Sequence, residues 1–410
     1  MPQMDKKTLA KLRCELRWES AIAKHCDCFS TARLNLWRDF FPPQLENDLM
    51  GRSPGEQTRY SFAPGELVEP TSLRQCFPLK SHQFNHRFGN KGWIEQRNGR
   101  FYPRGMLQEI STIFVEDRHP FRLVKLADKT ETESAFYADL NHPLASYSLD
   151  LQITITGIWA QGEQRGGRSQ DVAALLTDNG PGMQTRWRDQ PTDFWSDMPF
   201  MRRDCRADLA FYDQPRLIAH LDQTAQDELA ALHGQLLAPN SQVLDLMSSW
   251  QTHLPEELAL AELVGLGLNQ VELDANPRLT ERVVHDLNTT PQLPFADRQF
   301  DAVLCSLSIE YLIEPVAVLR EVVRVLKPGG VCVIGFSNRW FPTKAIQLWE
   351  GIHEFERPGL VLEYFIAAGG FTELETFSLR GLPRPANDKY ADQVALSDPI
   401  HAVWGRRSAN

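Results

Sequence analysis

The residues best placed to do chemistry follow a short apolar run in the second half of the chain. Residues 243–246 are predicted to form a buried strand, and Asp245 is the acid that closes it. Two hydroxyl side chains, Ser248 and Ser249, follow in a polar turn. In doubly wound α/β proteins, a ligand binds where a strand ends and the chain turns into the next helix. These side chains therefore predict a ligand site, and we expect the second half of the chain to be organised around it.

Strand and helix signals alternate through this half of the chain. Short apolar runs predict strands, and apolar residues at helical spacing predict the helices between them. One helix is expected to stop at Lys327-Pro-Gly-Gly330, because proline and glycine end helices. This alternation indicates an α/β fold with a parallel sheet and right-handed crossovers. The expected strands are 243–246, 263–268, 283–284, 300–307, 330–336, 372–379 and 400–404; the expected helices are one or two over 208–237, 270–276, 315–326 and 359–368, and an amphipathic segment is expected to start near 255.

Three stretches in this half resemble a known family. They are Leu293-Pro-Phe295, Phe300-Asp-Ala-Val-Leu-Cys-Ser306 and Val325-Leu-Lys-Pro-Gly-Gly330. Their order and spacing are similar to the third to fifth strands of class I S-adenosylmethionine-dependent methyltransferases of the type 11-like kind, and the resemblance covers residues 208–407. It implies a doubly wound, Rossmann-like sheet, S-adenosylmethionine as the cofactor, and methyl transfer to an unidentified, small-molecule acceptor.

The resemblance also implies which residues hold the cofactor. Asp245 corresponds to the acid that orients the methionine end. Asp286 and Leu287 correspond to the pair that bounds the adenine, with the carboxylate accepting from its exocyclic amine. Ser306 begins the turn that lies beside the transferable methyl group. Two aromatic residues stand where the leading helix of the family covers the cofactor: Phe211 and Tyr212.

Two positions depart from the family pattern. The family's first loop is rich in glycine, which lets the backbone turn sharply beside a ligand, but Met247, Ser249 and Gln251 stand there. Gly267 replaces an acid that binds the ribose hydroxyls through hydrogen bonds worth about 1.5–3 kcal/mol each. Nearby polar residues that could compensate are Ser248, Ser249 and Asn269. Two hypotheses follow: an active enzyme with an unusual cofactor loop, or a fold that has lost S-adenosylmethionine.

Methyl transfer depends on the alignment of the nucleophile with the methyl group, and a general base is optional. No catalytic residue is therefore assigned from the sequence. His353, Glu354 and Tyr311 lie on segments that could line the substrate mouth, although a structural role is the simpler interpretation. Asn338 and Arg339 follow a predicted strand at its ligand-binding end, where either a substrate contact or a structural role fits them.

The first half of the chain carries several short strand signals at about ten-residue spacing, which indicates an antiparallel β unit. Within it, Asp139-Leu-Asn-His-Pro-Leu-Ala145 and the alternating run at 149–155 resemble the end of an FKBP-type domain of the SlyD kind. The segment 49–56 is similar to the part that precedes the flap insertion of that family, so residues 67–108 would form the inserted lobe. The expected strands are 58–62, 110–115, 121–126, 134–138 and 148–158.

The FKBP-like resemblance implies prolyl isomerisation and a possible peptide or protein partner. Two interpretations stay open, an active isomerase or a degenerate module kept for packing or partner binding. For the whole chain, the alternative to a methyltransferase is a non-catalytic scaffold whose FKBP-like half binds peptide, and a third hypothesis has that half present a protein substrate. The expected domains are 1–160 and 207–410, joined by a linker at 161–206.

Composition excludes several other classes. A net charge of −10 argues against a general nucleic-acid binder. No apolar run reaches the roughly 18 residues that span a bilayer, and the N-terminal stretch lacks the apolar region of a secretory signal, so no membrane partner is expected. Seven cysteines, an odd number, are typical of reduced thiols in a cytoplasmic protein.

Two clusters contain side chains that could bind a metal ion. They are His25-Cys-Asp-Cys28 and the pair His82 and His86, which could share one face of a helix. Neither has the paired spacing of a zinc site, so we expect no metal.

Overall fold

The computed structural model describes residues 2–89, 92–110, 120–125, 136–160 and 168–409. The chain forms two compact units, and neither is continuous in sequence. The first comprises Met1–Ala21, Thr31–Asp197 and Ile352–Gly359, and the second comprises Ile22–Ser30, Met198–Gly351 and Leu360–Asn410. The domains expected at 1–160 and 207–410 thus fall mainly in different units, but each half gives a short segment to the unit of the other.

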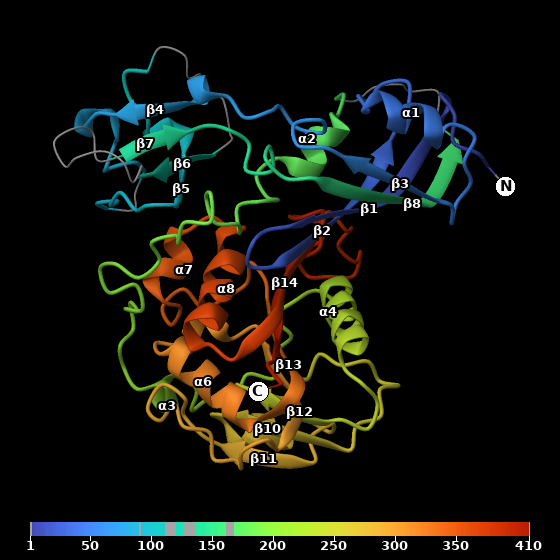
Figure 1. The fold of residues 1–410 in the computed structure, drawn as a ribbon. Helices are drawn as coiled ribbons and strands as arrows, with labels where there is room; N and C mark the ends of the chain where they lie inside the picture. Colours follow the sequence, from blue (N-terminus) through green and yellow to red (C-terminus); the bar gives the residue numbers. More distant parts are fainter. Residues whose placement is uncertain (1, 90–91, 111–119, 126–135, 161–167, 410) are drawn as a thin grey trace. The chain divides into compact units, whose positions relative to one another are not determined.

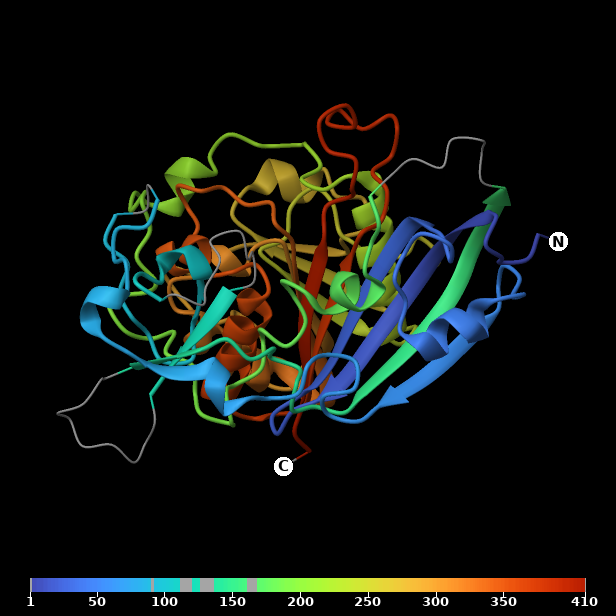
Figure 2. The ribbon, with the colours of Figure 1, turned by 90° about the horizontal axis from the view of Figure 1, so that it is seen from above.

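An antiparallel sheet organises the first unit. Its strands are β1 (Thr8–Glu19), β3 (Gln57–Phe62) and β8 (Leu149–Ala160), with β8 in the centre (Figure 2). On β1 alternate side chains are buried, among them Leu12 and Leu16, because successive residues of a strand face opposite sides of the sheet. The short helices α1 (Pro43–Leu49) and α2 (Val172–Thr177) belong to the same unit. The strands expected at 58–62 and 148–158 are confirmed, whereas β1 was not predicted.

A separate four-stranded sheet forms a lobe between β3 and β8. Its order is β4-β7-β6-β5, with β4 (Cys76–Leu79), β5 (Phe101–Pro103), β6 (Pro120–Val124) and β7 (Phe136–Asp139). Short 3₁₀ turns complete it: η1 (Leu73–Gln75), η2 (Ser81–Gln83) and η3 (Arg104–Met106). The core is aromatic, with Phe84, Tyr102 and Phe121 packed edge to face or tilted. The lobe therefore extends past residue 108, since the strands expected near 121–126 and 134–138 pair here; most of the strand expected at 110–115 lies outside the described residues.

The described part of the expected linker packs into the first unit as far as Asp197. Its aromatic residues Trp187 and Phe194 are buried, and Nε1 of Trp187 donates a 2.7 Å hydrogen bond to Oδ2 of Asp139. Arg122 donates from Nη2 to the carbonyl of Thr185 at 2.9 Å. Residues 168–197 are therefore part of a folded body, because a flexible linker would leave these aromatic rings in water.

The second unit is built on a mainly parallel sheet with the order β11-β10-β9-β12-β13-β15-β14 (Figure 1). Its strands are β9 (Gln242–Leu246), β10 (Glu262–Gly267), β11 (Glu281–Val284), β12 (Phe300–Ser306), β13 (Leu326–Phe336), β14 (Phe371–Arg380) and β15 (Ile400–Arg407). Strand β15 is antiparallel to both of its neighbours. All seven strands expected in this half are confirmed, and the crossovers bring the carboxyl ends of β9, β10, β11 and β12 to one edge.

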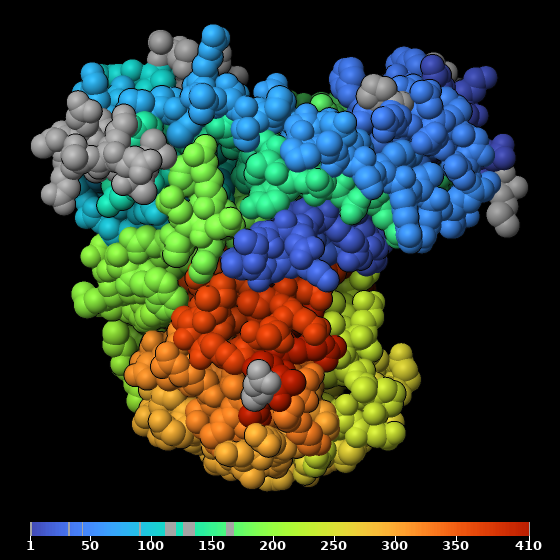
Figure 3. Space-filling model, in the orientation of Figure 1, coloured from blue at the N-terminus to red at the C-terminus, as the bar shows by residue number. Residues whose placement is uncertain are grey.

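Helices cover both faces of this sheet: α4 lies on one side, α6 and α8 on the other (Figure 1). They are α3 (Asp208–Phe211), α4 (Gln223–Leu236), α5 (Gln270–Asp274), α6 (Pro315–Val325), α7 (Gln347–Gly351) and α8 (Glu356–Ala368), with a 3₁₀ turn η4 (Ile309–Tyr311). Residues after about 300 form most of the surface of this unit in the view of Figure 3. The amphipathic segment expected near 255 is not helical, because residues 251–260 form turns and extended chain. No helix in the described ranges has the length and apolarity that a bilayer crossing requires.

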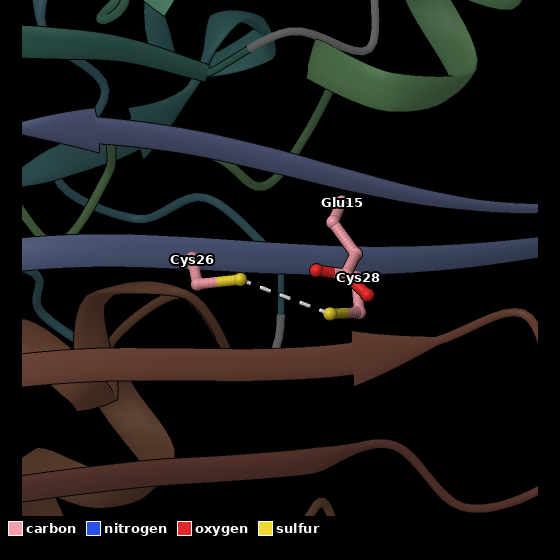
Figure 4. Close-up of side chains that lie close together, drawn as sticks. All are labelled: Glu15, Cys26 and Cys28. Carbon is pink, nitrogen blue, oxygen red and sulfur yellow. Dashed lines mark hydrogen bonds between the residues drawn. The ribbon is translucent and has the colours of Figure 1, made fainter. Parts of the chain in front are cut away.

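An N-terminal strand, β2 (Lys24–Leu34), pairs in parallel with β14 through residues 24–29. Alternation along β2 divides the cluster at 25–28 between two faces. Cys26 and Cys28 lie in an apolar cluster with their sulfur atoms 3.8 Å apart (Figure 4). On the other face Nδ1 of His25 lies 2.7 Å from Oγ1 of Thr376, and Asp27 pairs with Arg380. The four groups therefore do not converge on one point.

The second histidine pair also has structural contacts. His82 lies in η2 with Nε2 3.4 Å from a carboxylate oxygen of Glu109, whereas His86 lies outside that turn and stacks on Trp93. The two histidines do not share a helix face.

Candidate functional site

A cavity of about 320 Å³ opens in the second unit at the carboxyl ends of β9, β10, β11 and β12. Its volume is typical of a small-molecule site. All nine residues predicted to bind a cofactor line it: Asp245, Met247, Ser248, Ser249, Gly267, Asn269, Asp286, Leu287 and Ser306. The parallel topology explains why residues up to 61 positions apart meet, since each follows or ends a strand at the same edge of the sheet.

Asp245 is a buried carboxylate without a cationic partner among the described side chains. Its Oδ2 accepts a 2.7 Å hydrogen bond from Oγ of Ser248. Burial raises the pKa of Asp245 to about 6, because removal from water disfavours the charged form. A ligand that brings a positive charge to this carboxylate would therefore be bound strongly.

One residue in the turn after β9 adopts a backbone conformation that favours glycine. Met247 has a φ of 55°, in the left-handed region that non-glycine residues avoid. Oγ of Ser249 donates to Oε2 of Glu272 at 2.6 Å, and Nε2 of Gln251 donates to Oε1 of Gln226 at 2.5 Å. The side chains of Ser249 and Gln251 thus fasten the turn to its neighbours.

Replacing Met247 by glycine is expected to stabilise the protein by about 1 kcal/mol, because a left-handed residue with a Cβ costs roughly that much. Urea unfolding of the variant and the wild type would measure the difference. Met201→Gly offers a control, since Met201 is exposed and is not among the residues with a positive φ. A loss of more than about 1 kcal/mol in Met247→Gly would show that the methionine side chain matters more than its backbone strain.

Gly267 lines the cavity but has no room for a carboxylate. A Cβ at this position would lie 2.2 Å from the carbonyl oxygen of Ser248, and the backbone N–H of Ser248 donates to Leu266 at 2.8 Å. The turn after β9 is therefore packed on the end of β10, and only glycine allows this approach. The missing acid is a consequence of that packing.

Glu272 brings a carboxylate to the cavity from the first turn of α5, and the sequence analysis missed it. It is buried, its Oε1 accepts from the backbone N–H of Arg216 at 2.7 Å, and its Oε2 accepts from Ser249. Asn269 caps the same helix by accepting from the N–H of Glu272 at 3.1 Å, and its amide donates to the carbonyl of Tyr212. An acid one helical turn after a strand end is the signal that could have identified Glu272.

Asp286 and Ser306 line the cavity from the ends of their strands. Oδ1 of Asp286 accepts from the N–H of Asn288 at 2.9 Å, and Oδ2 accepts from Oγ1 of Thr289 at 2.9 Å. Leu287, beside Asp286, is buried. Ser306 ends β12, and Oγ of Ser308 donates to its carbonyl at 3.0 Å. Asp286 thus keeps a fixed carboxylate next to an apolar side chain at the cavity wall.

Aromatic rings form another wall. Phe341 packs against Phe211 and Tyr311, and the hydroxyl of Tyr311 accepts from the N–H of Phe341 at 2.9 Å. The guanidinium carbon of Arg216 lies 4.5 Å from the centre of the Phe211 ring and 5.2 Å from that of Phe341. Phe341 and Arg216 were missed, because no motif marks them and only the fold brings them to the cavity.

Only some of the other residues predicted for the substrate mouth line the cavity. Tyr311 and Arg339 line the cavity, and Nε of Arg339 donates to Oδ1 of Asp398 at 3.0 Å. Asn338 is not among the lining residues. The two remaining candidates, His353 and Glu354, belong to the first unit.

Comparison with known proteins bears on residues 249–334, which match the family model described as "Methyltransferase domain". The demethylmenaquinone methyltransferase of Renibacterium salmoninarum is 30% identical over 132 residues, which are 32% of this chain and 56% of that protein. The enzyme of the same name from Lactiplantibacillus plantarum is 29% identical over 171 residues, or 36% of this chain and 71% of that protein. The chain spans little more than half the length of the first of these relatives.

The solved structures that resemble the chain have lower sequence identity to it. The [4+2]-cyclase SpnF covers 50% of this chain and 92% of its own, with 19% identity and a TM-score of 0.34. An S-adenosylmethionine-dependent methyltransferase from Mesorhizobium loti covers 44% of this chain and 96% of its own, with 17% identity and a TM-score of 0.31. Residues 249–334 of the second unit are therefore similar to a methyltransferase domain.

Proposed function

We propose that the protein is an S-adenosylmethionine-dependent methyltransferase that acts on a small molecule. The observation that carries this proposal is the convergence of the unpaired, buried Asp245 with Asp286 and Leu287 in one cavity of the matched domain. The curated relatives are named for a quinone-type acceptor, and the aromatic wall of this cavity suits a planar ring.

The residues of the cavity fit the proposed cofactor. Asp245 would hold the ammonium group of its methionine end, because a buried carboxylate gains most from a positive partner. Asp286 would accept from the exocyclic amine of the adenine, with Leu287 against the ring. When bound, S-adenosylmethionine supplies a methyl group on a sulfonium centre. The protein would contribute alignment at Ser306 and exclusion of water by Phe341, so no general base is required.

Isothermal titration with S-adenosylmethionine and S-adenosylhomocysteine tests the proposal directly. We expect micromolar dissociation constants for both ligands. The heat of binding to the full chain should saturate at one ligand molecule per chain as the ligand is raised to millimolar concentration. No binding under these conditions would refute the enzyme and favour the scaffold hypothesis.

We propose further that Glu272 takes over the ribose contact that Gly267 lacks. The change Glu272→Gln is expected to weaken S-adenosylhomocysteine binding by roughly 10–100-fold, since a hydrogen bond to a charged group is worth about 1.5–3 kcal/mol. Titration of 2′,3′-dideoxyadenosine supplies the comparison, because a ligand without these hydroxyls should bind both proteins equally.

Glu262→Gln is the matched control for this change, because Glu262 begins β10 and does not line the cavity. Equal losses for both ligands in Glu272→Gln would indicate that the glutamate only supports the turn of Ser249, and would exclude a ribose contact.

For the first unit we propose an FKBP-like accessory module that binds peptide. The support is its antiparallel sheet with a lobe inserted between β3 and β8. The residues that prompted the resemblance have structural contacts, which favours the degenerate module: Asn141 accepts from Ser72 at 2.7 Å, and Nε2 of His142 lies 3.1 Å from the carbonyl of Thr177. An isomerase assay of the full chain on a proline peptide would distinguish the degenerate module from an active isomerase, since only an active isomerase would give a measurable rate.

A further inference from the structure

Two cations of the cavity wall have no acidic partner. Arg216 and Lys389 line the cavity, and among the described residues neither forms an ion pair, whereas Arg339 beside them is paired with Asp398. Nη1 of Arg216 is shielded from solvent and has no hydrogen-bond partner in the part of the chain that the structure describes. An unpaired, shielded guanidinium costs free energy, and an incoming acceptor would recover it.

The surroundings of Arg216 hold its charge in place. Its guanidinium lies over the rings of Phe211 and Phe341, and Nη2 donates to the carbonyl of Phe211 at 3.1 Å. Because a guanidinium does not lose its proton in proteins, the positive charge persists in this partly buried place. Stacking on both rings also fixes the plane of the group, which favours a planar anion.

His220 lines the same cavity as the two cations. Its ring lies 5.3 Å from that of Phe341, edge to face. Burial lowers the pKa of His220, and Arg216 and Lys389 lower it further, while Glu272 opposes them. The histidine is therefore neutral at pH 7 and can donate a hydrogen bond without adding charge.

We propose that Arg216 and Lys389 form a carboxylate-binding subsite of the cavity. Asp245 supplies the opposite charge at the same cavity, so a ligand with both an ammonium and a carboxylate group would satisfy all three. The carboxylate can come from the methionine end of the cofactor, in which case the inference rests on the proposed function, or from the methyl acceptor. The chemistry at the protein is the same in both cases.

The experiment compares three probes on the full chain. S-adenosylhomocysteine carries the carboxylate, 5′-methylthioadenosine lacks it, and benzoate is a planar carboxylate without the nucleoside. Arg216→Gln and Lys389→Gln are titrated with each probe, with Arg320→Gln as the control because Arg320 is exposed on α6 and does not line the cavity. Thermal melting of each variant confirms folding, and Lys389, exposed at the rim, can be changed without affecting the core.

We expect Arg216→Gln to raise the dissociation constant of S-adenosylhomocysteine at least tenfold and to change that of 5′-methylthioadenosine by less than twofold. This result would show that the subsite binds the carboxylate of the cofactor. A second result would show that the subsite binds a carboxylate of the methyl acceptor. In that case the variant binds both nucleosides as the wild type does, but it no longer binds benzoate when it is saturated with S-adenosylhomocysteine. Equal weakening of both nucleosides, or no change with any probe, would overturn the subsite.

Failure of the proposed function is a separate result. If the wild type binds neither nucleoside, the methyltransferase proposal fails, and benzoate titrated into the ligand-free protein still decides the subsite. Benzoate binding that both variants lose would support the subsite, and its absence in the wild type would overturn it.

Discussion

Asp245→Asn is expected to weaken cofactor binding strongly and at the same time to stabilise the ligand-free protein. Loss of one partner from a buried ion pair costs about 3–5 kcal/mol, so S-adenosylhomocysteine should bind roughly 100-fold more weakly or worse. The affinity of the wild type should also fall below about pH 6, as the carboxylate gains a proton, and the asparagine variant should lack that pH dependence.

The stabilisation follows from the raised pKa. The pKa of Asp245 is about 6 in the fold against 3.8 for an ordinary aspartate, so the folded state binds the proton more tightly than the unfolded state. The free energy of unfolding of the wild type therefore decreases as the pH rises from about 4 to about 6. Above pH 6, Asp245→Asn should be more stable by up to about 3 kcal/mol, since each unit of pKa difference is worth about 1.4 kcal/mol.

Urea unfolding at pH 5 and pH 7.5, with titration of S-adenosylhomocysteine at both values, measures the two effects together. Asp227→Asn is the charge-matched control, because Asp227 is exposed on α4. Full affinity in Asp245→Asn would contradict the assigned role of this carboxylate, and equal stability of the two proteins at pH 7.5 would contradict its raised pKa.

Restoring the family's acid by Gly267→Asp should damage the site. The new Cβ would lie 2.2 Å from the carbonyl oxygen of Ser248, which is backbone and cannot rotate away. We expect a loss of about 3 kcal/mol in the free energy of unfolding, the upper end of the usual cost of overpacking, together with weaker binding of S-adenosylhomocysteine.

Gly265→Ala, two residues earlier on β10, is the matched control. Its Cβ would meet Cδ1 of Leu279 at 2.5 Å, the end of a side chain that can change rotamer, so the loss should be smaller. Denaturant unfolding compares the variants. Wild-type stability in Gly267→Asp with tighter ligand binding would show that the turn of Ser248 moves freely and that the acid was simply lost.

The sequence predicted the second unit well because its signals are local. Each strand there is a short apolar run, and Asp245, Asp286 and Ser306 stand at or just after strand ends, so the sheet topology brings them together. The glycine-poor turn was noticed, but its cause was not visible. The contact between Gly267 and the Ser248 carbonyl joins the end of β10 to the turn after β9, and no motif in either segment predicts it.

The residues that were missed depend on distant contacts. The backbone N–H of Arg216 donates to the side-chain carboxylate of Glu272 across 56 positions, and Phe341 completes the wall from beyond β13. In the first unit, β1 carries charged residues between its buried ones, and the lobe draws β6 and β7 from beyond residue 108. The FKBP-like identity of this unit stays a prediction, because the family match lies at 249–334.

The pairing of β2 with β14 has a consequence for synthesis of the chain on the ribosome. His25 and Thr376, which face each other there, are 351 positions apart. At about 5–20 residues per second, the early strand would wait roughly 20–70 seconds for its partner to be translated. During that time the backbone groups of residues 24–29 that pair with β14 lack this partner strand, and Cys26 and Cys28 lack the apolar cluster that they share with Leu379. The pairing of β2 with β14 can therefore form only after most of the second unit has been translated.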